Sequence, residues 1–492
     1  MVAEEFSEIR IVDLGGDVRA NPKLSGTKHN VFGIQTGVAI SFLVKRHKAK
    51  GCRIFYARRP ELETADEKLA FLGGAKLGEL SFAEARPDKA GSWINISEND
   101  FDDLCPIATK IGKGVKSTTE VRAIFRLFAG GIKTNRDDWV YDFDPKILKK
   151  KTTFFYEALS AGPHPNKNGP YDDRIKWSRD LKLKAARSAK FEQPSLKPVV
   201  SSWRPFVQRS YWPDKILSDI LTEFHFRFFG RDLDKRNPTI AFLCRYSSNP
   251  LAALAVQGPF DYCLLKRGNG GTEAVTRWIF NELGFPQENV TDWALNEFQK
   301  RLKSARGTSR RSISKEAIFQ YVYAVLNDPV YCETYANELR RDLPRIPFYK
   351  DFWQWAEWGK QLMDLHIGYE TVEPWKLKRT DIPDEKARQA GLAPKALLKA
   401  DREAGNIRLD SETILAGVPA EAWDYRLGNR SALEWVLDQY KEKKPRDPTI
   451  REKFDTYRFA DYKEKVIELL ARVTTVSVET QGIVEAMRRA AR

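Results

Sequence analysis

The stretch E8-I-R-I-V-D-L-G-G16 decides the fold of the N-terminal part of this chain. Its apolar side chains alternate and then stop at a glycine pair, which predicts a buried strand that ends in a loop. Two further apolar runs follow, GVAISFLVKR at 37–46 and CRIFYARR at 52–59, and the polar segment HKAKG between them predicts a hairpin. ADEKLAFLGG at 65–74 has the composition of a helix that runs into glycine. Together these segments predict an α/β unit.

The length and the net charge of the chain limit the number of domains and the class of partner. A chain of 492 residues is expected to hold two to four domains, because single cores stop growing well below that size. No apolar run reaches the length of a membrane span, and five scattered cysteines favour reduced thiols in a cytoplasm. The net charge of +15 favours a polyanionic partner, above all nucleic acid. The alternative is a basic surface that only keeps the protein in solution.

The pattern of residues along the sequence changes twice beyond residue 110. Short strand-like pieces separated by turn residues predict a mixed α/β region, and from about 285 the pattern becomes mostly helical. Helices are expected to start at a Thr or Ser, with Ser314 as one cap. The tryptophans of FWQWAEW at 352–358 and His366 are interpreted as packing residues rather than as a base-stacking platform or a metal ligand.

Sequence motifs for chemistry are not found. The glycines of GGAKLG at 73–78 and GKG at 112–114 lack the spacing of a nucleotide loop, and no Walker motif is present. The five histidines lack metal-ligand spacing, and no nucleophile elbow occurs. No catalytic, cofactor-binding or metal-ligating residue is therefore assigned.

Two basic segments are candidates for binding nucleic acid. If IKWSRDLKLKAARSAK is helical, Lys176, Arg179, Arg187 and Lys190 fall roughly on one face, which suits a phosphate backbone. SSWRPFVQRSYW places arginines among aromatic residues, which suits contacts in a groove. The competing interpretation is a solvated helix and an aromatic core with surface arginines, and the residues alone leave both open.

Several of these stretches together resemble one family. IRIVDLGGDVRANPKLSGTKHNVFGIQTGVAISFLVKR at 9–46 resembles the segment that follows the catalytic Asn-Pro-Pro-Tyr/Phe loop of γ-type adenine-N6 DNA methyltransferases. GGIKTNRDDWVYDF at 130–143 resembles the hinge into their target-recognition domain. IKWSRDLK, WRPFVQRSYW, VTDWALNEF and the long strings at 314–348 and 425–462 then follow in the order seen in type ISP restriction-modification enzymes. The resemblance covers nearly the whole chain.

The resemblance implies a protein that works with other parts. Type ISP enzymes carry nuclease, helicase, methyltransferase and recognition parts, and the complete enzyme uses S-adenosylmethionine. The cofactor loop and the Asn-Pro-Pro-Tyr/Phe tetrapeptide should precede residue 9, and only a few residues do. We therefore expect no cofactor on this chain alone and an N-terminal methyltransferase/helicase polypeptide or segment as partner. Residues 1–100 are expected to be the least stable region.

The expected architecture is α/β and α+β, in three parts. These are a partial Rossmann-like methyltransferase sheet at 1–110, a mixed α/β target-recognition domain at 111–375 and a helical C-terminal specificity region at 376–492. The expected function is sequence-specific recognition of duplex DNA in a cytoplasmic type ISP-like system. The alternatives are a methyltransferase subunit active only in trans, an inactive remnant of a truncated gene, and a nucleic-acid scaffold without site preference. The expected backbone contacts are Arg136, Lys176, Arg179, Arg187 and Arg209, and Arg204 is the expected base reader.

Overall fold

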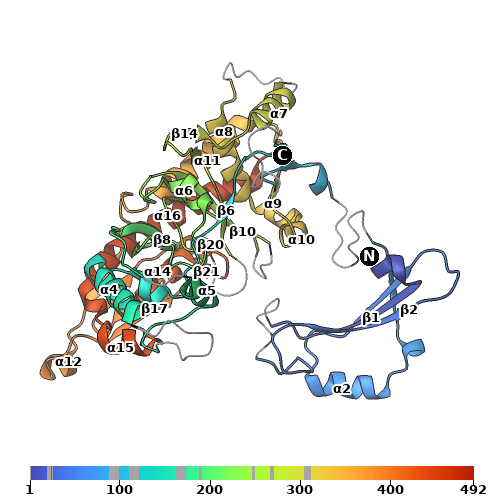
Figure 1. Cartoon of the computed structure of the whole chain (residues 1–492), viewed down its shortest axis with the longest axis horizontal. Helices are drawn as coiled ribbons and strands as arrows, with labels where there is room; N and C mark the ends of the chain where they lie inside the picture. Colours follow the sequence, from blue (N-terminus) through green and yellow to red (C-terminus); the bar gives the residue numbers. More distant parts are fainter. Residues whose placement is uncertain are drawn as a thin grey trace. The chain divides into compact units, whose positions relative to one another are not determined.

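The computed structural model describes residues 2–18, 24, 26–87, 93, 99–109, 121–161, 173–187, 191–245, 250–265, 271–303 and 312–492. The chain divides into two compact units, Met1–Asp100 and Phe101–Arg492. Figure 1 draws unit 1 in blue, and the colours from teal to red belong to unit 2. Each unit is described by itself.

Unit 1 is built on a four-stranded sheet of order β2-β1-β3-β4. Its strands are β1 Glu8–Gly15, β2 Val38–Val44, β3 Arg53–Arg58 and β4 Ala83–Ala85, and its helices are α1 Val2–Glu5 and α2 Ala65–Gly74. The predicted strand and the predicted helix are confirmed, and Thr64 and Glu67 cap α2 reciprocally.

The predicted hairpin in unit 1 is wrong. β2 and β3 do not pair with each other, because β1 lies between them, antiparallel to β2 and parallel to β3. Ile9 faces Leu43 on one side and Ile54 on the other. A central strand is covered on both faces more often than an edge strand, and β1 is the most buried strand of this sheet.

The core of unit 1 is small, and its edge strand is open. The buried cluster consists of Ile9, Ile11 and Ile54. No residue of β2 is buried, although its sequence is VAISFLV, and 45% of the Leu43 surface is exposed. An apolar strand with open faces and a free edge is a template for pairing with another segment.

Unit 2 contains several small sheets. Their strand orders are β11-β10-β12-β6, β7-β9-β8, β16-β19-β18-β17, β13-β14, β15-β5 and β20-β21. The strands are β5 Cys105–Pro106, β6 Ala129–Gly130, β7 Tyr141–Asp142, β8 Val199–Arg204, β9 Val207–Tyr211, β10 Pro238–Leu243, β11 Ala252–Gln257, β12 Glu273–Thr276, β13 Trp278–Phe280, β14 Pro286–Glu288, β15 Arg345–Ile346, β16 Lys378–Asp381, β17 Ala396–Asp401, β18 Asn406–Asp410, β19 Thr413–Ala416, β20 Arg426–Leu427 and β21 Arg430–Ser431.

Helices cover these sheets. They are α3 Asp137–Val140, α4 Pro145–Ala161, α5 Arg179–Arg187, α6 Glu223–Phe229, α7 Asp292–Lys303, α8 Lys315–Leu326, α9 Pro329–Thr334, α10 Ala336–Leu339, α11 Phe352–Ile367, α12 Glu385–Gln389, α13 Ala420–Asp424, α14 Ala432–Tyr440, α15 Pro448–Lys453 and α16 Lys463–Arg489. The expected cap is confirmed, since the Ser314 side chain accepts from the Ala317 amide at the start of α8.

The helix pair α8 and α11 forms the centre of one core. A Cβ on Gly359 would lie 1.8 Å from the Gln320 carbonyl oxygen, so the two backbones approach as closely as only glycine permits. Trp355 is fully buried in this core. His366 is buried too, with Nδ1 2.5 Å from the Tyr323 hydroxyl and Nε2 2.9 Å from Thr480 Oγ1. Both residues are packing residues, as the sequence predicted.

The C-terminal region differs from its prediction. It begins with an antiparallel sheet, β16-β19-β18-β17, so the prediction of a helical region from 376 is wrong for its first part. Ile407, Leu409 and Leu415 alternate with exposed or half-buried residues and fill the core side of this sheet. Helix α16, drawn in red in Figure 1, then contacts α9, α11, α13 and α14. Its side chains belong to both core clusters of unit 2. The three-part division of the chain stays a prediction.

Candidate nucleic-acid interface

Helix α5 carries the basic segment singled out in the sequence. Ser178 caps it, because its hydroxyl accepts from the Leu181 amide at 3.1 Å. Leu181 and Ala185 are four residues apart and are buried against the unit. Arg179 and Arg187 lie on the exposed side of the helix, and Lys176 is exposed just before it. The sequence predicted four cations on one helical face. Arg179 and Arg187 lie on α5, Lys176 lies before it, and Lys190 lies outside the described residues.

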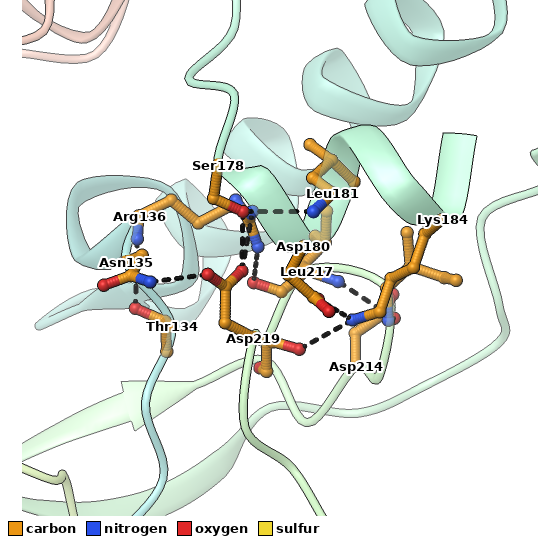
Figure 2. Close-up of polar contacts among 12 residues, drawn as sticks. Thr134, Asn135, Arg136, Ser178, Asp180, Leu181, Lys184, Asp214, Leu217 and Asp219 are labelled. Carbon is orange, nitrogen blue, oxygen red and sulfur yellow. Dashed lines mark hydrogen bonds and ion pairs between the residues drawn. The ribbon is translucent and has the colours of Figure 1, made fainter. Parts of the chain in front are cut away.

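A buried arginine fixes the start of α5 (Figure 2). Arg136 is 0% exposed. Its Nη1 donates to the Leu217 carbonyl at 2.5 Å, and its Nη2 donates to Ser178 Oγ at 2.6 Å and to Asp219 Oδ1 at 3.0 Å. Ser178 in turn donates to the same Asp219 oxygen at 2.8 Å. The helix cap, the hinge segment and the loop 214–219 are thereby tied together at one guanidinium.

The rest of this network closes around Asp219. Asn135 holds a left-handed backbone conformation at φ 56° and donates from Nδ2 to Asp219 Oδ2 at 2.5 Å. Burial lowers the pKa of Arg136, and the Asp219 carboxylate opposes that shift. Figure 2 shows Asn135, Arg136 and Ser178 converging on Asp219 from the hinge and from α5. A charge-assisted network with this many acceptors holds its guanidinium inside the protein.

Lys184, in the middle of α5, ties the helix to the loop 214–219. Lys184 Nζ donates to the Lys215 carbonyl at 2.6 Å and to the Ser218 carbonyl at 3.0 Å, and it pairs with Asp180 at 2.5 Å. The loop is itself rigid, since Asp214 accepts from the Tyr156 hydroxyl and from the Ile216 amide. Two inward-directed cations therefore hold α5 in place and leave its outer cations to the solvent.

Arg204 is buried and Arg209 is half-buried, and both contact other side chains of the unit. Arg204 Nη1 donates to the buried Asp261 Oδ1 at 2.7 Å, and its guanidinium lies 4.0 Å from the Trp203 ring centroid. The guanidinium of Arg209 stacks over Phe143 at 4.5 Å and over Trp203 at 4.8 Å. Burial lowers the pKa of Arg209. Like Arg136, both have structural partners, and their contact with DNA stays a prediction.

The structure also exposes cations that the sequence had not indicated as candidates for binding nucleic acid. Lys146, Lys149 and Lys150 lie on the outer side of α4, whereas Lys151 is buried against Asp142 at 2.6 Å. The run K149-K-K151 could have indicated these cations in the sequence. The apolar Leu148 and Phe155 lie seven residues apart, as on the buried face of a helix, and this places the neighbouring lysines outside. The described residues hold no cluster of three or more metal ligands, and no described helix is long and apolar enough to cross a membrane.

Comparison with known proteins gives a family and a set of similar structures. The family model described as the Type ISP C-terminal specificity domain matches residues 123–469. A complex of DrdV with DNA, solved by cryo-electron microscopy, is 39% identical over 100% of this chain and 48% of that one, with a TM-score of 0.87. A search of curated proteins finds no match.

Two more distant structures share the fold. They are a nuclease-deletion mutant of the Type ISP restriction-modification enzyme LlaGI in complex with a DNA substrate mimic, and the ATP-dependent Type ISP restriction-modification enzyme LlaBIII bound to DNA. The identities are 24% and 21%, and the TM-scores 0.77 and 0.80. The matches cover 99% and 100% of this chain but 44% and 31% of those chains. The chain thus spans about half or less of the length of the proteins that it resembles.

Proposed function

The chain belongs to the family of Type ISP C-terminal specificity domains, and we propose that it recognises duplex DNA sequence-specifically as the specificity part of a Type ISP restriction-modification system. The observation that carries this proposal is the family match over residues 123–469, which contains α5 and its anchors. The DNA-bound state of the three similar structures supports it. The net charge of +15 fits a polyanionic partner.

Helix α5 supplies backbone contacts in this proposal. Arg179 and Arg187 are exposed at the two ends of this helix, and the exposed Lys176 precedes them. Phosphate contacts set the register and orientation of a recognition domain without reading sequence. We assign Arg136 and Lys184 as positioning residues, because their side-chain donors are used to hold the helix. Base reading is assigned to no residue.

Salt dependence tests the assignment of α5. Replacing Arg179 and Arg187 by Gln removes two phosphate contacts, so the slope of log K against log salt falls by about 1.8. A matched pair, Arg451→Gln with Arg489→Gln, removes the same charge from α15 and α16 and keeps the slope within about 0.5 of the wild-type value. Equal slopes for the two variants would remove α5 from the interface.

Unit 1 supports a second part of the proposal. We infer that it is the end of a methyltransferase α/β sheet that a further N-terminal polypeptide or segment completes. The observation in favour is strand β2, which is apolar and has no buried residue. The chain would then act in adenine-N6 methylation only together with that partner, which would supply the catalytic tetrapeptide.

The turn after β1 supports the proposal that this chain alone does not hold S-adenosylmethionine. The turn after β1 is filled by protein, since a Cβ on Gly16 would lie 2.5 Å from the His29 carbonyl oxygen. Asn30 is buried there and donates from Nδ2 to the Gly16 and Thr36 carbonyls. This turn leaves no cradle for a cofactor, so no catalytic step is assigned to the chain.

Hydrogen exchange tests the incomplete sheet. Amides of β1 and β3 are expected to exchange well before those of β10 and β12, because a core of three residues protects them. A complementary polypeptide should slow that exchange, and Leu43→Glu on β2 should abolish the protection without changing unit 2. Exchange in unit 1 as slow as in unit 2 would show that the sheet needs no partner.

A further inference from the structure

A basic concavity lies between β17, the turn from β20 to β21, and α14. Its volume is about 420 Å³. Four cations line it, Lys399, Arg402, Arg430 and Lys441, against two carboxylates, Glu434 and Asp438. The charged lining therefore has an excess of two positive charges. It shares no residue with α5 and its anchors.

The two carboxylates are already engaged in the structure. Glu434 caps α14 by accepting from the Ser431 amide at 2.9 Å, and it also accepts from Arg402 Nε at 3.1 Å. Asp438 pairs with Arg430 at 3.0 Å and with Lys443 at 3.2 Å. The carboxylates therefore hold the arginines in position, and each arginine keeps donors that they do not use.

The two lysines of the concavity have no side-chain partner. The ammonium groups of Lys399 and Lys441 make no hydrogen bond or ion pair within the part of the chain that the structure describes. Arg430 Nη1 is engaged with Asp438 Oδ2 at 3.0 Å, which leaves the donors on its other nitrogens. Unused donors on three cations converge on one concavity, which is the arrangement that a tetrahedral oxyanion would satisfy.

The backbone of β17 is distorted at this place. The register between β17 and β18 shifts between Ala396 and Lys399, and Leu398 adopts φ 46°, a left-handed conformation that is unfavourable for leucine. Leu398 is buried, so the bulge is held by packing. Bulges redirect the side chains that follow them, and strained residues gather at binding sites.

We infer that this concavity binds a phosphate group, either one in the DNA backbone or one carried by a free phosphate or nucleotide. Binding of a DNA phosphate rests on the proposed function, whereas binding of free phosphate or a nucleotide does not. Lys399 and Lys441 supply the charge, and Arg402 and Arg430 supply oriented guanidinium donors that the carboxylates hold in place.

The test uses the full chain with Lys399→Gln and Lys441→Gln together. The control is Lys360→Gln with Lys465→Gln, which removes the same charge from exposed positions on α11 and α16. Two measurements are made on each protein. One is the salt dependence of binding to a duplex, and the other is the shift in Tm on adding inorganic phosphate at matched ionic strength.

The expected result is a salt slope lower by about 0.9 for each lost phosphate contact, together with a phosphate-induced rise in Tm that only the pocket variant lacks. A lost Tm shift with an unchanged slope supports the pocket and assigns it to free phosphate. If the pocket variant keeps both the salt slope and the phosphate-induced Tm shift of the wild type, the inference is overturned, and the proposal of DNA binding is unaffected. If the wild type binds no DNA but keeps its phosphate shift, the proposed function fails and the pocket stands.

Discussion

The hinge around Arg136 and the outer side of α5 are adjacent regions that place the same residue type in opposite environments. Arg136 is 0% exposed and donates to a carbonyl, a hydroxyl and a carboxylate. Arg179 and Arg187 are exposed and have no hydrogen-bond partner among the described residues. The difference teaches that an arginine in a basic or aromatic segment does not by itself predict a DNA contact. What decides its role is the number of acceptors that the fold places around it.

The largest expected effect lies in the hinge. Arg136→Met leaves Asp219 buried without its cation, so the free energy of unfolding should fall by about 3–5 kcal/mol. The matched change Arg179→Met on the surface of α5 should cost less than about 0.5 kcal/mol. Urea unfolding followed by circular dichroism measures both. If both variants lost the same free energy of unfolding, the hinge and the outer side of α5 would not differ in the way described above.

The next effect concerns the pair of Arg204 and Asp261. Burial raises the pKa of Asp261 to about 6, against the opposing effect of Arg204. The folded protein therefore keeps a proton that the unfolded chain releases near its ordinary pKa of about 3.9. The stability from this group is fully present below that value and is lost as pH rises to 6, by up to about 3 kcal/mol.

Unfolding titrations between pH 4 and 7 measure that dependence, with Asp261→Asn as the reference. The difference between the wild type and this variant isolates the one carboxyl from the other acids that titrate in the same range. A difference that stays flat over this window would mean that Asp261 is ionised throughout, and that Arg204 compensates its burial.

A smaller effect is expected on the outside of α5. Arg179→Gln with Arg187→Gln should weaken binding to every duplex about tenfold, which is about 1.4 kcal/mol, and should leave Tm unchanged. Fluorescence anisotropy with a specific and a scrambled duplex measures it. A loss confined to one sequence would instead make one of these arginines a base reader.

The smallest effect connects the two regions. Ser178→Ala removes the cap of α5 and one acceptor of Arg136, which should cost about 1 kcal/mol. Hydrogen exchange should then accelerate at the first amides of α5, and DNA affinity should fall by a few-fold although every cation is still present. Ser178→Thr, which keeps the hydroxyl, should restore both. A variant with faster exchange and unchanged affinity would show that DNA binding does not need an ordered helix start.

Local features of this fold were predictable from the sequence. The strand 8–15, the helix 65–74, the cap at Ser314 and the burial of Trp355 and His366 each have a sequence signal that lies within a few residues, although the hydrogen-bond partners of His366 are distant. The helix hypothesis for the basic segment 175–190 rests on a signal of the same kind, and α5 occupies 179–187 of that segment. Such signals are carried by the segment itself.

The features that were missed depend on distant segments. Arg136 pairs with Asp219 and Arg204 with Asp261, across 83 and 57 residues of sequence, and no local pattern indicates either partner. The parallel pairing of β1 with β3 was missed for the same reason, since a short polar linker indicates a hairpin equally well. The sheet at 378–416 does have a local signal, because apolar and polar residues alternate in N406-I-R-L-D410.

The measurement that tests the account most directly is selection of the purified chain on a pool of random duplex DNA at about 0.15 M salt, with the bound fraction sequenced. The account predicts enrichment of one defined motif, and the Arg179→Gln, Arg187→Gln variant should enrich the same motif at lower yield. Binding without any enriched motif would contradict sequence-specific recognition by this chain, and would leave it a basic scaffold for nucleic acid.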